Sequence, residues 1–482
     1  MPRRNLTTIV YVGVLSMICF SQVDHGLYAA RMRQIMNHIH DDGLYQADRR
    51  DLFEAAARAM ADTVDENTQF ITAEQKREFE QSLDQEFGGI GAVLESFEGR
   101  PRIRHVLYDQ PAARAGLLPG DVVVAVDGVD TKEFERLGDF TNAVKGKPGE
   151  PVTLTIERKG TDESLEFTVT RAIIEIESVK GYVRRADGTW DFAIPDAPNI
   201  AYIRIDGNFG SKTYEELTEA LETVHEKKFA GLILDVRNNP GGRLDAAEQI
   251  CNLFLPADRV ILTTRDRKGR IRETYRSDGS GPYQEIPLAV VINKHSASAS
   301  EIVAGCLKDN GRAIVVGERT FGKGTVQRLF AVDGGRSTLK LTTASFWTPS
   351  ERQIHRSRDN GGDEREGADE SAEWGIEPND GFEVVIDDRQ IGRLLRHFDR
   401  LDFAAIDGDA ALPDDPIAPD PPPTDSSLPD DSDDGDAKET PGEETSDDKP
   451  ADADNPFADI QLERAIEAVK QLIAEPQVKQ AA

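Results

Sequence analysis

Cysteine is scarce in this chain of 482 residues, which has only Cys19, Cys251 and Cys306. Three cysteines cannot form the network of disulfides that stabilises small secreted domains. Pairs of the Cys-x-x-Cys type and clusters of cysteine with histidine, which hold structural zinc, are also lacking. The sequence therefore predicts neither a metal site nor a bound cofactor.

Positive charge is also in short supply, since 57 Lys and Arg face 88 Asp and Glu, for a net charge of −31. Binding to phosphate groups requires clustered basic residues, so we exclude nucleic acid as a partner. Half of the excess lies in one stretch, because residues 407–454 hold 18 acidic residues against Lys438 and Lys449. This stretch is rich in Asp, Pro, Ser and Glu, so we expect an acidic disordered linker over residues 406–456.

Long apolar runs are absent except near the amino end, where Arg3 and Arg4 precede an uncharged, mainly apolar run from Leu6 to Phe20. A short basic region followed by an apolar one is typical of an export signal. Residues 1–26 are therefore predicted to be a signal peptide or an uncleaved membrane anchor. We expect an exported, periplasmic or extracytoplasmic protein, attached to the membrane in the second case.

The rest of the chain divides by its hydrophobic periodicity. Helical spacing predicts an N-terminal helical segment over residues 27–83, and short alternating runs with a helix near residues 134–144 predict a β-rich domain over 84–171. From residue 172 to 405, buried strands alternate with helices, which indicates an α/β core with parallel pairing. A final helix over residues 457–482 carries an apolar stripe and is expected to dock on the core.

The first stretch that suggests chemistry lies in this core, where the apolar run from Val290 to Ile292 leads through Ser296, Ser298 and Ser300 into a helix. A hydroxyl at such a turn lies beside unpaired amides of the helix N-terminus, which can stabilise an oxyanion. The same serines could simply cap the helix, because serine is a favoured N-cap residue. From this stretch alone both interpretations stay open.

A second stretch places Lys323 between Gly322 and Gly324. A buried lysine with a lowered pKa can act as a base, and the flanking glycines allow close packing around it. A solvent-exposed lysine in a glycine-rich hairpin is the alternative. A phosphate-binding loop is rejected, since Gly324 occupies the position where that motif requires serine or threonine.

Together these stretches, in this order and 25 residues apart, resemble the carboxyl-terminal processing proteases, also called tail-specific proteases. The resemblance implies a Ser-Lys dyad with Ser298 as the nucleophile and Lys323 as the general base, and Gln327 orienting the lysine amine. Three further hydroxyls would support the dyad, namely those of Ser296, Ser300 and Thr325. The implied fold is a crotonase-like α/β protease core with an inserted PDZ domain and flanking helices.

Residues 234–242 resemble the strand and glycine turn that supplies half of the oxyanion hole in this family, and the implied donors are the amides of Gly242 and Ala299. Read without the family, Asn-Pro-Gly-Gly after an apolar strand is first of all a turn. The role of Gly242 therefore depends on the other two motifs.

The β-rich domain resembles a PDZ module, whose peptide-binding loop would be formed by Gly88, Gly89, Ile90 and Gly91. Such a module adds a peptide as an extra strand and holds its terminal carboxylate on loop amides. The expected partners are therefore protein or peptide substrates with free C-termini. A homo-oligomer is compatible with the motifs but is not indicated by them.

Two departures from the family pattern leave alternatives. His295 lies next to Ser296 where a small residue is usual, so a Ser-His pair is an alternative, although no acidic motif is present to orient it. Residues 356–372 form a charged insertion. The rival functions are a catalytically silent PDZ scaffold that binds C-terminal peptides and, on the same core fold, an acyl-CoA enzyme for which no basic cluster is visible.

Overall fold

The computed structural model describes residues 26–76, 79, 86–356, 374–407 and 457–481. Residues 1–25 of the predicted export segment, most of the acidic linker and residues 357–372 of the insertion fall outside these ranges. The chain forms two units, one made of its first 79 residues with Val326–Ala344, and the other of Glu80–Thr325 with Ser345–Ala482.

The first unit combines the N-terminal helices with a distant part of the chain. A helix over residues 26–42 and α2 (Arg49–Asp62) are followed by β1 (Gln69–Ile71), which pairs antiparallel with β21 (Ser337–Trp347). β20 (Thr325–Val332) pairs with β21 on its other side. The prediction of helix through residue 83 is therefore wrong at β1, because pairing with residues 338–340 overrides local propensity there.

In the second unit the β-rich domain comes first along the chain. Its main sheet has the order β3-β4-β5-β7-β8, and β2 pairs separately with β9. The predicted helix is α5 (Leu137–Val144), which packs Phe140 and Val144 into the domain core. The elements are β2 (Glu86–Gly89), β3 (Ala92–Phe97), β4 (Arg100–Val106), α4 (Pro111–Ala115), β5 (Val122–Val126), β6 (Val129–Asp130), β7 (Pro151–Glu157), β8 (Leu165–Thr170) and β9 (Ala172–Glu175).

The α/β core that follows has the parallel sheet that the buried runs predict. Its order is β10-β14-β15-β18-β19, with parallel pairing from β14 to β19, and every residue of β15 and β18 is buried. The strands are β10 (Val179–Lys180), β14 (Ala197–Ile205), β15 (Gly231–Asp235), β18 (Leu288–Ile292) and β19 (Ile314–Gly317), with β13 (Ala193–Ile194) paired to β14. Two hairpins accompany them, β11 (Val183–Arg184) with β12 (Trp190–Asp191), and β16 (Val260–Arg265) with β17 (Ile271–Arg276).

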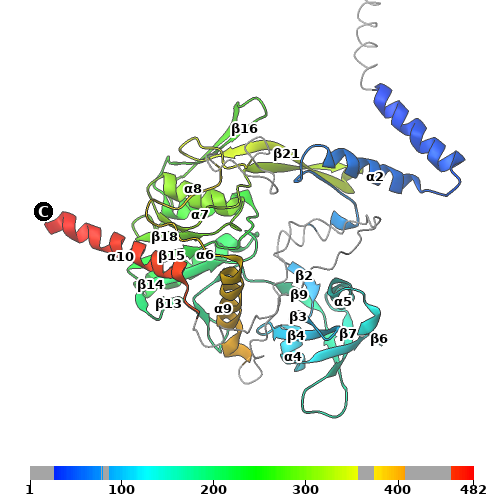
Figure 1. Cartoon of the computed structure of the whole chain (residues 1–482), viewed down its shortest axis with the longest axis horizontal. Coiled ribbons are helices and arrows are strands. Elements are labelled where there is room, and N and C mark those ends of the chain that lie inside the picture. The colour runs from blue at the N-terminus through cyan, green and yellow to red at the C-terminus, as the bar shows by residue number, and fades with distance from the viewer. Residues whose placement is uncertain (1–25, 77–78, 80–85, 357–373, 408–456, 482) are drawn as a thin grey trace, which may run out of the picture. The chain divides into compact units, whose positions relative to one another are not determined.

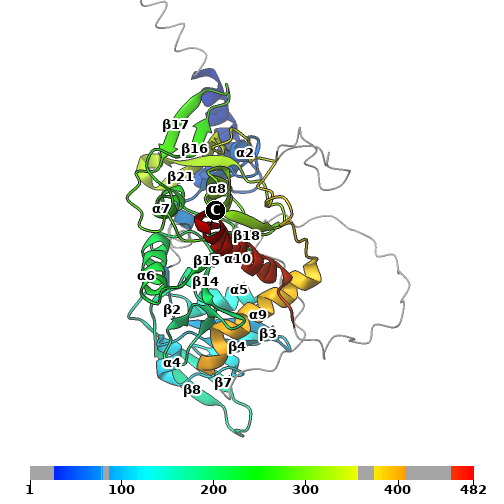
Figure 2. The same cartoon turned by 90° about the vertical axis from the view of Figure 1, so that its left-hand side faces the viewer.

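Helices follow the sheet strands, as expected for parallel pairing. These are α6 (Thr213–Glu226), α7 (Leu244–Phe254) and α8 (Ala299–Asp309). The final helix α10 (Ile460–Ala481) crosses β15 and β18 and packs Leu462, Ile466 and Val469 against the sheet (Figure 2). Docking of this helix is confirmed. It begins at Ile460, where the carboxylate of Asp459 accepts the Leu462 N–H at 3.0 Å.

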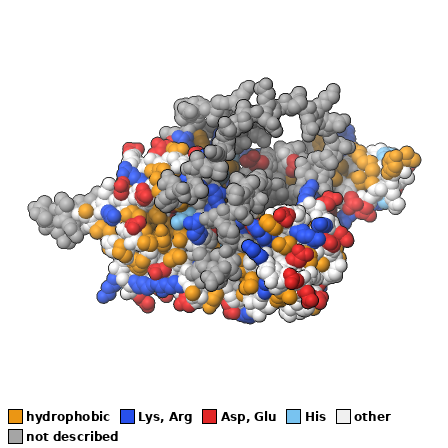
Figure 3. Space-filling model, turned by 60° about the horizontal axis from the view of Figure 1, so that its bottom comes forward, with side chains coloured by type: hydrophobic (Ala, Val, Ile, Leu, Met, Phe, Trp, Pro, Cys, Tyr) orange, Lys and Arg blue, Asp and Glu red, His pale blue; other side chains and the backbone are white. Residues whose placement is uncertain are grey.

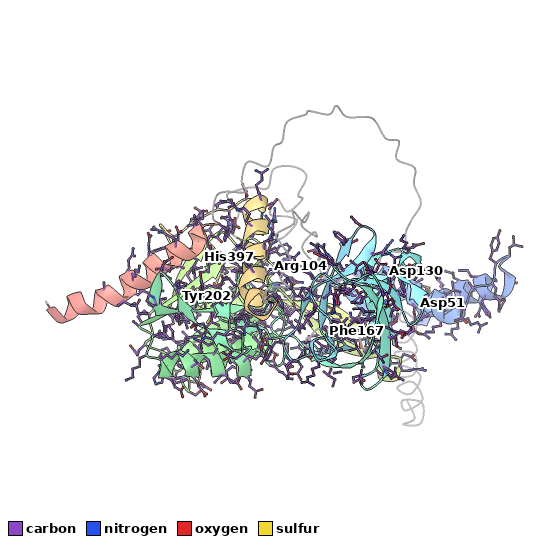
Figure 4. All side chains as sticks on the ribbon, turned by 90° about the horizontal axis from the view of Figure 1, so that it is seen from below. Asp51, Arg104, Asp130, Phe167, Tyr202 and His397 are labelled. Carbon is purple, nitrogen blue, oxygen red and sulfur yellow. The ribbon has the colours of Figure 1, made fainter. Side chains whose placement is uncertain are left out.

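A buried charged network joins this helix to the strand next to it. The Arg237 guanidinium, 2% exposed, pairs with Asp235 at 2.6 Å and with Asp459 at 2.8 Å. Asp235 also accepts the hydroxyl of Tyr202, which lies on β14 (Figure 4). Arg237, in the turn after β15, is thus paired with Asp235 at the end of that strand and with Asp459 at the start of α10.

The last helix of the core proper, α9 (Asp388–Asp407), contacts both the sheet and the β-rich domain. Its Asp402 pairs with Arg204 of β14 at 2.7 Å, and its Asp399 pairs with Arg104 of β4 at 2.6 Å. On the face shown in Figure 3, acidic and basic side chains are interspersed. This mixture agrees with a strong acidic excess that is concentrated in residues 407–454.

Candidate active site

Ser298 lies where β18 turns into α8, as the sequence predicts. It is the N-cap residue of α8, and its side chain is only partly exposed. Its backbone has φ +54° and ψ −111°, a conformation that residues other than glycine seldom adopt. Strained backbone of this kind persists only where the surroundings enforce it, and it is concentrated at functional sites.

The turn after β15 packs directly against this serine. A Cβ added to Gly241, which has φ +99°, would lie 2.6 Å from the Cβ of Ser298 and 2.8 Å from the Ala299 nitrogen. Gly242, with φ +147°, bridges to Phe209, where an added Cβ would lie 2.4 Å from the carbonyl oxygen. Glycine is therefore required at both positions, because only hydrogen fits in the space.

Two of the expected supporting hydroxyls hold these turns together. Ser296 Oγ donates to the Val236 carbonyl at 2.8 Å, and Ser300 Oγ donates to the Asn239 carbonyl at 2.9 Å. The Ala297 N–H also donates to Asn239, at 3.0 Å. The nucleophile turn and the glycine turn therefore form one hydrogen-bonded body.

The amides named as oxyanion donors lie within this body. Over the described residues, neither the Gly242 N–H nor the Ala299 N–H has an acceptor among the protein groups. Ala299 is buried, where backbone N–H groups are nearly always paired, and Gly242 is exposed. An unpaired N–H at each position fits the binding of an external oxygen.

Lys323 follows β19 in a segment whose glycines permit close packing, as predicted. A Cβ on Gly322 would lie 2.8 Å from the ring of Trp374, and one on Gly324 would lie 2.3 Å from the His355 nitrogen. The lysine side chain itself is only partly exposed. Lys323 therefore does not lie in the solvent-exposed hairpin that was the alternative.

One carboxylate joins this segment to the nucleophile. Glu301 Oε2 accepts the backbone N–H of Ser298 at 2.8 Å and that of Lys323, also at 2.8 Å. The sequence motifs assign no role to Glu301. The spacing Ser298-x-x-Glu301 is that of a capping box, which would have predicted the first bond. The second bond crosses 22 residues of chain and has no local signal.

Gln327 lies in the first unit on β20, where its amide donates to Thr342 Oγ1 at 3.2 Å. His295 is half-buried, and burial, followed by the nearby Lys294 charge, lowers the pKa of its imidazole. Among the described residues, no hydrogen bond joins its ring to Ser298 or to a carboxylate. The arrangement therefore gives no support to a Ser-His pair.

The glycine loop of the β-rich domain opens onto an apolar pocket. Its members Gly89, Ile90 and Gly91 line the pocket, while Gly88 packs closely on the Gly146 carbonyl. The neighbouring strand β3 is at the edge of the main sheet, with β4 on one side only. The other lining residues are Phe87, Ala92, Leu94, Ile103, Val123, Phe140, Thr141, Val144, Lys145 and Leu154.

Comparisons with known proteins agree with these features. A model of peptidase family S41 matches residues 199–361, and a PDZ domain model matches residues 102–158. A carboxy-terminal-processing protease of Bartonella bacilliformis is 33% identical over 329 residues, which cover 67% of this chain and 72% of the relative. A carboxyl-terminal-processing protease of Synechocystis is 35% identical over 304 residues, covering 62% and 68%. The solved photosystem II D1 C-terminal processing protease aligns with 76% of this chain and 89% of its own, at 25% identity and a TM-score of 0.43.

Proposed function

The chain belongs to peptidase family S41, among the carboxy-terminal-processing proteases, and is a serine-type peptidase with a PDZ domain; on this basis we propose that Ser298 and Lys323 form its catalytic dyad. The observation that carries the proposal is the shared Glu301 oxygen, which accepts the backbone N–H groups of both residues at 2.8 Å. The two residues therefore lie on adjoining segments although 25 residues separate them.

The proposed reaction is hydrolysis of a peptide bond through an acyl-enzyme. Lys323, as the neutral amine, takes the proton of the Ser298 hydroxyl while the serine oxygen attacks the substrate carbonyl carbon. The amides of Gly242 and Ala299 bind the oxyanion, and the lysine then gives its proton to the leaving amine. Water attacks the ester while Lys323 accepts its proton, and Lys323 returns that proton to the Ser298 oxygen as the ester bond breaks, which releases the product acid and the free serine.

The family resemblance assigns Gln327, which lies four residues after Lys323, the role of orienting the lysine amine. The same resemblance extends to a crotonase-like description of the core. It is supported by the parallel pairing from β14 to β19 and by the helices that follow these strands.

We also propose that the PDZ domain recognises the C-terminal tails of substrates. A tail would add to the exposed edge of β3, with its carboxylate on the amides of residues 88–91. The pocket lining is mostly apolar and includes Ile90, Val123 and Phe140, which favours an apolar last residue. The proposed activity is thus cleavage of proteins from or near their C-termini.

Replacing either dyad residue tests the function. Lys323→Ala and Ser298→Ala are each expected to lower kcat by about 10⁴-fold on a fluorogenic peptide, because each removes a group that acts at the reacting atoms. A fluorophosphonate probe should label the wild-type enzyme far faster than Ser298→Ala, which lacks the nucleophile, or Lys323→Ala, whose serine has lost its base. Robust cleavage by purified Lys323→Ala would contradict the dyad, and the absence of labelling and cleavage by wild type would favour the silent scaffold.

Export is proposed from residues 1–26, whose basic and apolar regions carry the signal. Within the described ranges, no helix is long and apolar enough to cross a bilayer. Cell fractionation of the full chain and of a variant lacking residues 1–26 separates the alternatives. A membrane-bound full chain indicates an anchor, and a shortened soluble form outside the cytoplasm indicates a cleaved signal. A full chain that stays in the cytoplasm contradicts export.

A further inference from the structure

Glu301 presents a buried carboxylate whose two oxygens are both fully engaged. Besides the two bonds of Oε2 to Ser298 and Lys323, Oε1 accepts the Gly322 N–H at 2.7 Å and the Thr320 hydroxyl at 2.6 Å. The side chain is 0% exposed. A carboxylate offers about four lone-pair sites, so this one has none left for solvent.

Helix capping does not require this arrangement. In a capping box the glutamate at N3 needs to accept only the N–H of the N-cap residue. Here three of the four donors come from residues 320–323, in the segment that carries the base. Glu301 therefore fixes the backbone of Lys323 relative to the backbone of Ser298.

We propose that Glu301 is the positioning residue of the dyad, and that it acts only as the carboxylate. The inference rests on the proposed roles of Ser298 and Lys323. Proton transfer between them requires heavy-atom distances close to those of a hydrogen bond, and an error of about 1 Å costs about 10²-fold in rate. One oxygen bound to both backbones supplies the common reference that such accuracy requires.

The ionisation of Glu301 makes this role dependent on pH. Burial raises its pKa to about 7, although the four donors favour the charged form. A proton on Oε2 would displace a backbone N–H donor, and a proton on Oε1 would be held only if the Thr320 hydroxyl turned to accept it, so the four donors could no longer all point at the carboxylate. The charged and titratable groups on the segments packed around it are Lys294 and His295 before α8, and Glu318, Arg319 and Lys323 after β19. Lys308 and Asp309 lie at the far end of α8.

Glu301→Gln tests the proposal directly. The amide would present N–H groups to two of the four donors, so the variant should retain KM and lose about 10²-fold in kcat. Glu216→Gln is the matched control, because Glu216 also accepts two backbone N–H groups and a hydroxyl, from Ser178 and Val179, away from the dyad. This control should lower thermal stability and leave kcat unchanged.

The pH profile supplies a measurement that a purely structural role would not change. In wild type, activity requires loss of the proton of Glu301, whose pKa is about 7, so this ionisation should add one unit to the slope of log kcat against pH at the acidic end. In Glu301→Gln that unit should be lost. A folded Glu301→Gln enzyme with wild-type kcat, or with the wild-type acidic slope, would overturn the inference.

If Glu301→Gln does not fold, Thr320→Val gives the answer instead. It removes one of the four donors, so the acidic limb of the profile should move to higher pH, with a kcat about tenfold lower at pH 7. An unchanged limb would overturn the inference. Failure of the dyad itself would look different, because Ser298→Ala or Lys323→Ala would then retain activity.

Discussion

Two glycine turns of this molecule are proposed to offer backbone N–H groups to a peptide, and they are supported in different ways. The turn at Gly241 and Gly242 is held by buried charge and side-chain amides, through Asp235, Arg237 and Asn239. The loop at residues 88–91 is held by apolar packing around Ile90. Stabilising an oxyanion requires N–H donors that point in a fixed direction, whereas the addition of a peptide as an extra strand tolerates small shifts of the loop. Changes at the first turn should therefore reduce kcat or folding, and changes at the second should reduce affinity.

The charged support of the catalytic turn should give the largest effect. Arg237→Met keeps much of the volume but leaves the Asp235 and Asp459 carboxylates without their cation. Breaking such a buried pair costs about 3–5 kcal/mol in the free energy of unfolding. Urea unfolding measures this loss. Arg114→Met is the control, since Arg114 and Asp109 are both exposed and a surface pair of this kind contributes little to stability. Equal stability of both variants would contradict a charge-supported turn.

A change at the glycine that touches the nucleophile comes next. In Gly241→Ala the new methyl group would meet Ser298 and displace the oxyanion turn, so kcat should fall by about 10²–10³-fold with little change in KM. Gly279→Ala is the matched control, because Gly279 has φ +75° and an equally close neighbour in Ala257, away from the site. The control should lose stability alone. A rise in KM with unchanged kcat for Gly241→Ala would show that the turn serves binding.

The peptide loop should give the smallest effect, and one of a different kind. Gly91 has φ +77°, and an added Cβ would lie 2.4 Å from the Cβ of Gln110. Gly91→Ala should weaken binding of a C-terminal peptide by about tenfold, or about 1.4 kcal/mol. Fluorescence polarisation measures the affinity, and kcat on a short peptide should not change. In the control Gly99→Ala, with φ +75° and open space around it, peptide affinity should stay as in wild type. Equal loss in both variants would contradict a binding role.

Much of the fold could be predicted from the sequence because its signals are local. Buried apolar runs indicated β15 and β18, and alternation indicated β5 and β7. β1 was missed because a strand of three residues is stabilised only by pairing with residues 338–340. No local pattern indicated that residues 326–344 group with the N-terminal segment.

The residue types of the candidate site and their local positions could be predicted from the sequence, but the long-range contacts that hold them could not. The motifs placed Ser298 and Lys323 correctly at a strand-to-helix turn and between packed glycines. They could not give the positive φ of Ser298, because packing against Gly241 is a long-range effect. They also could not reveal that Glu301 bonds to residues 320, 322 and 323, since those contacts depend on how two loops meet.

The docked helix α10 limits when the parallel sheet can finish folding. Its apolar residues cover one face of the parallel sheet, and Asp459 satisfies Arg237 beside the catalytic turn. Domains begin to fold during synthesis from the N-terminal side, but this sheet face stays uncovered until residues 459–473 have been made. The peptidase therefore matures late, after the sequence of its dyad has long left the ribosome. Any trimming that reached α10 would uncover this face of the sheet and leave Arg237 without Asp459.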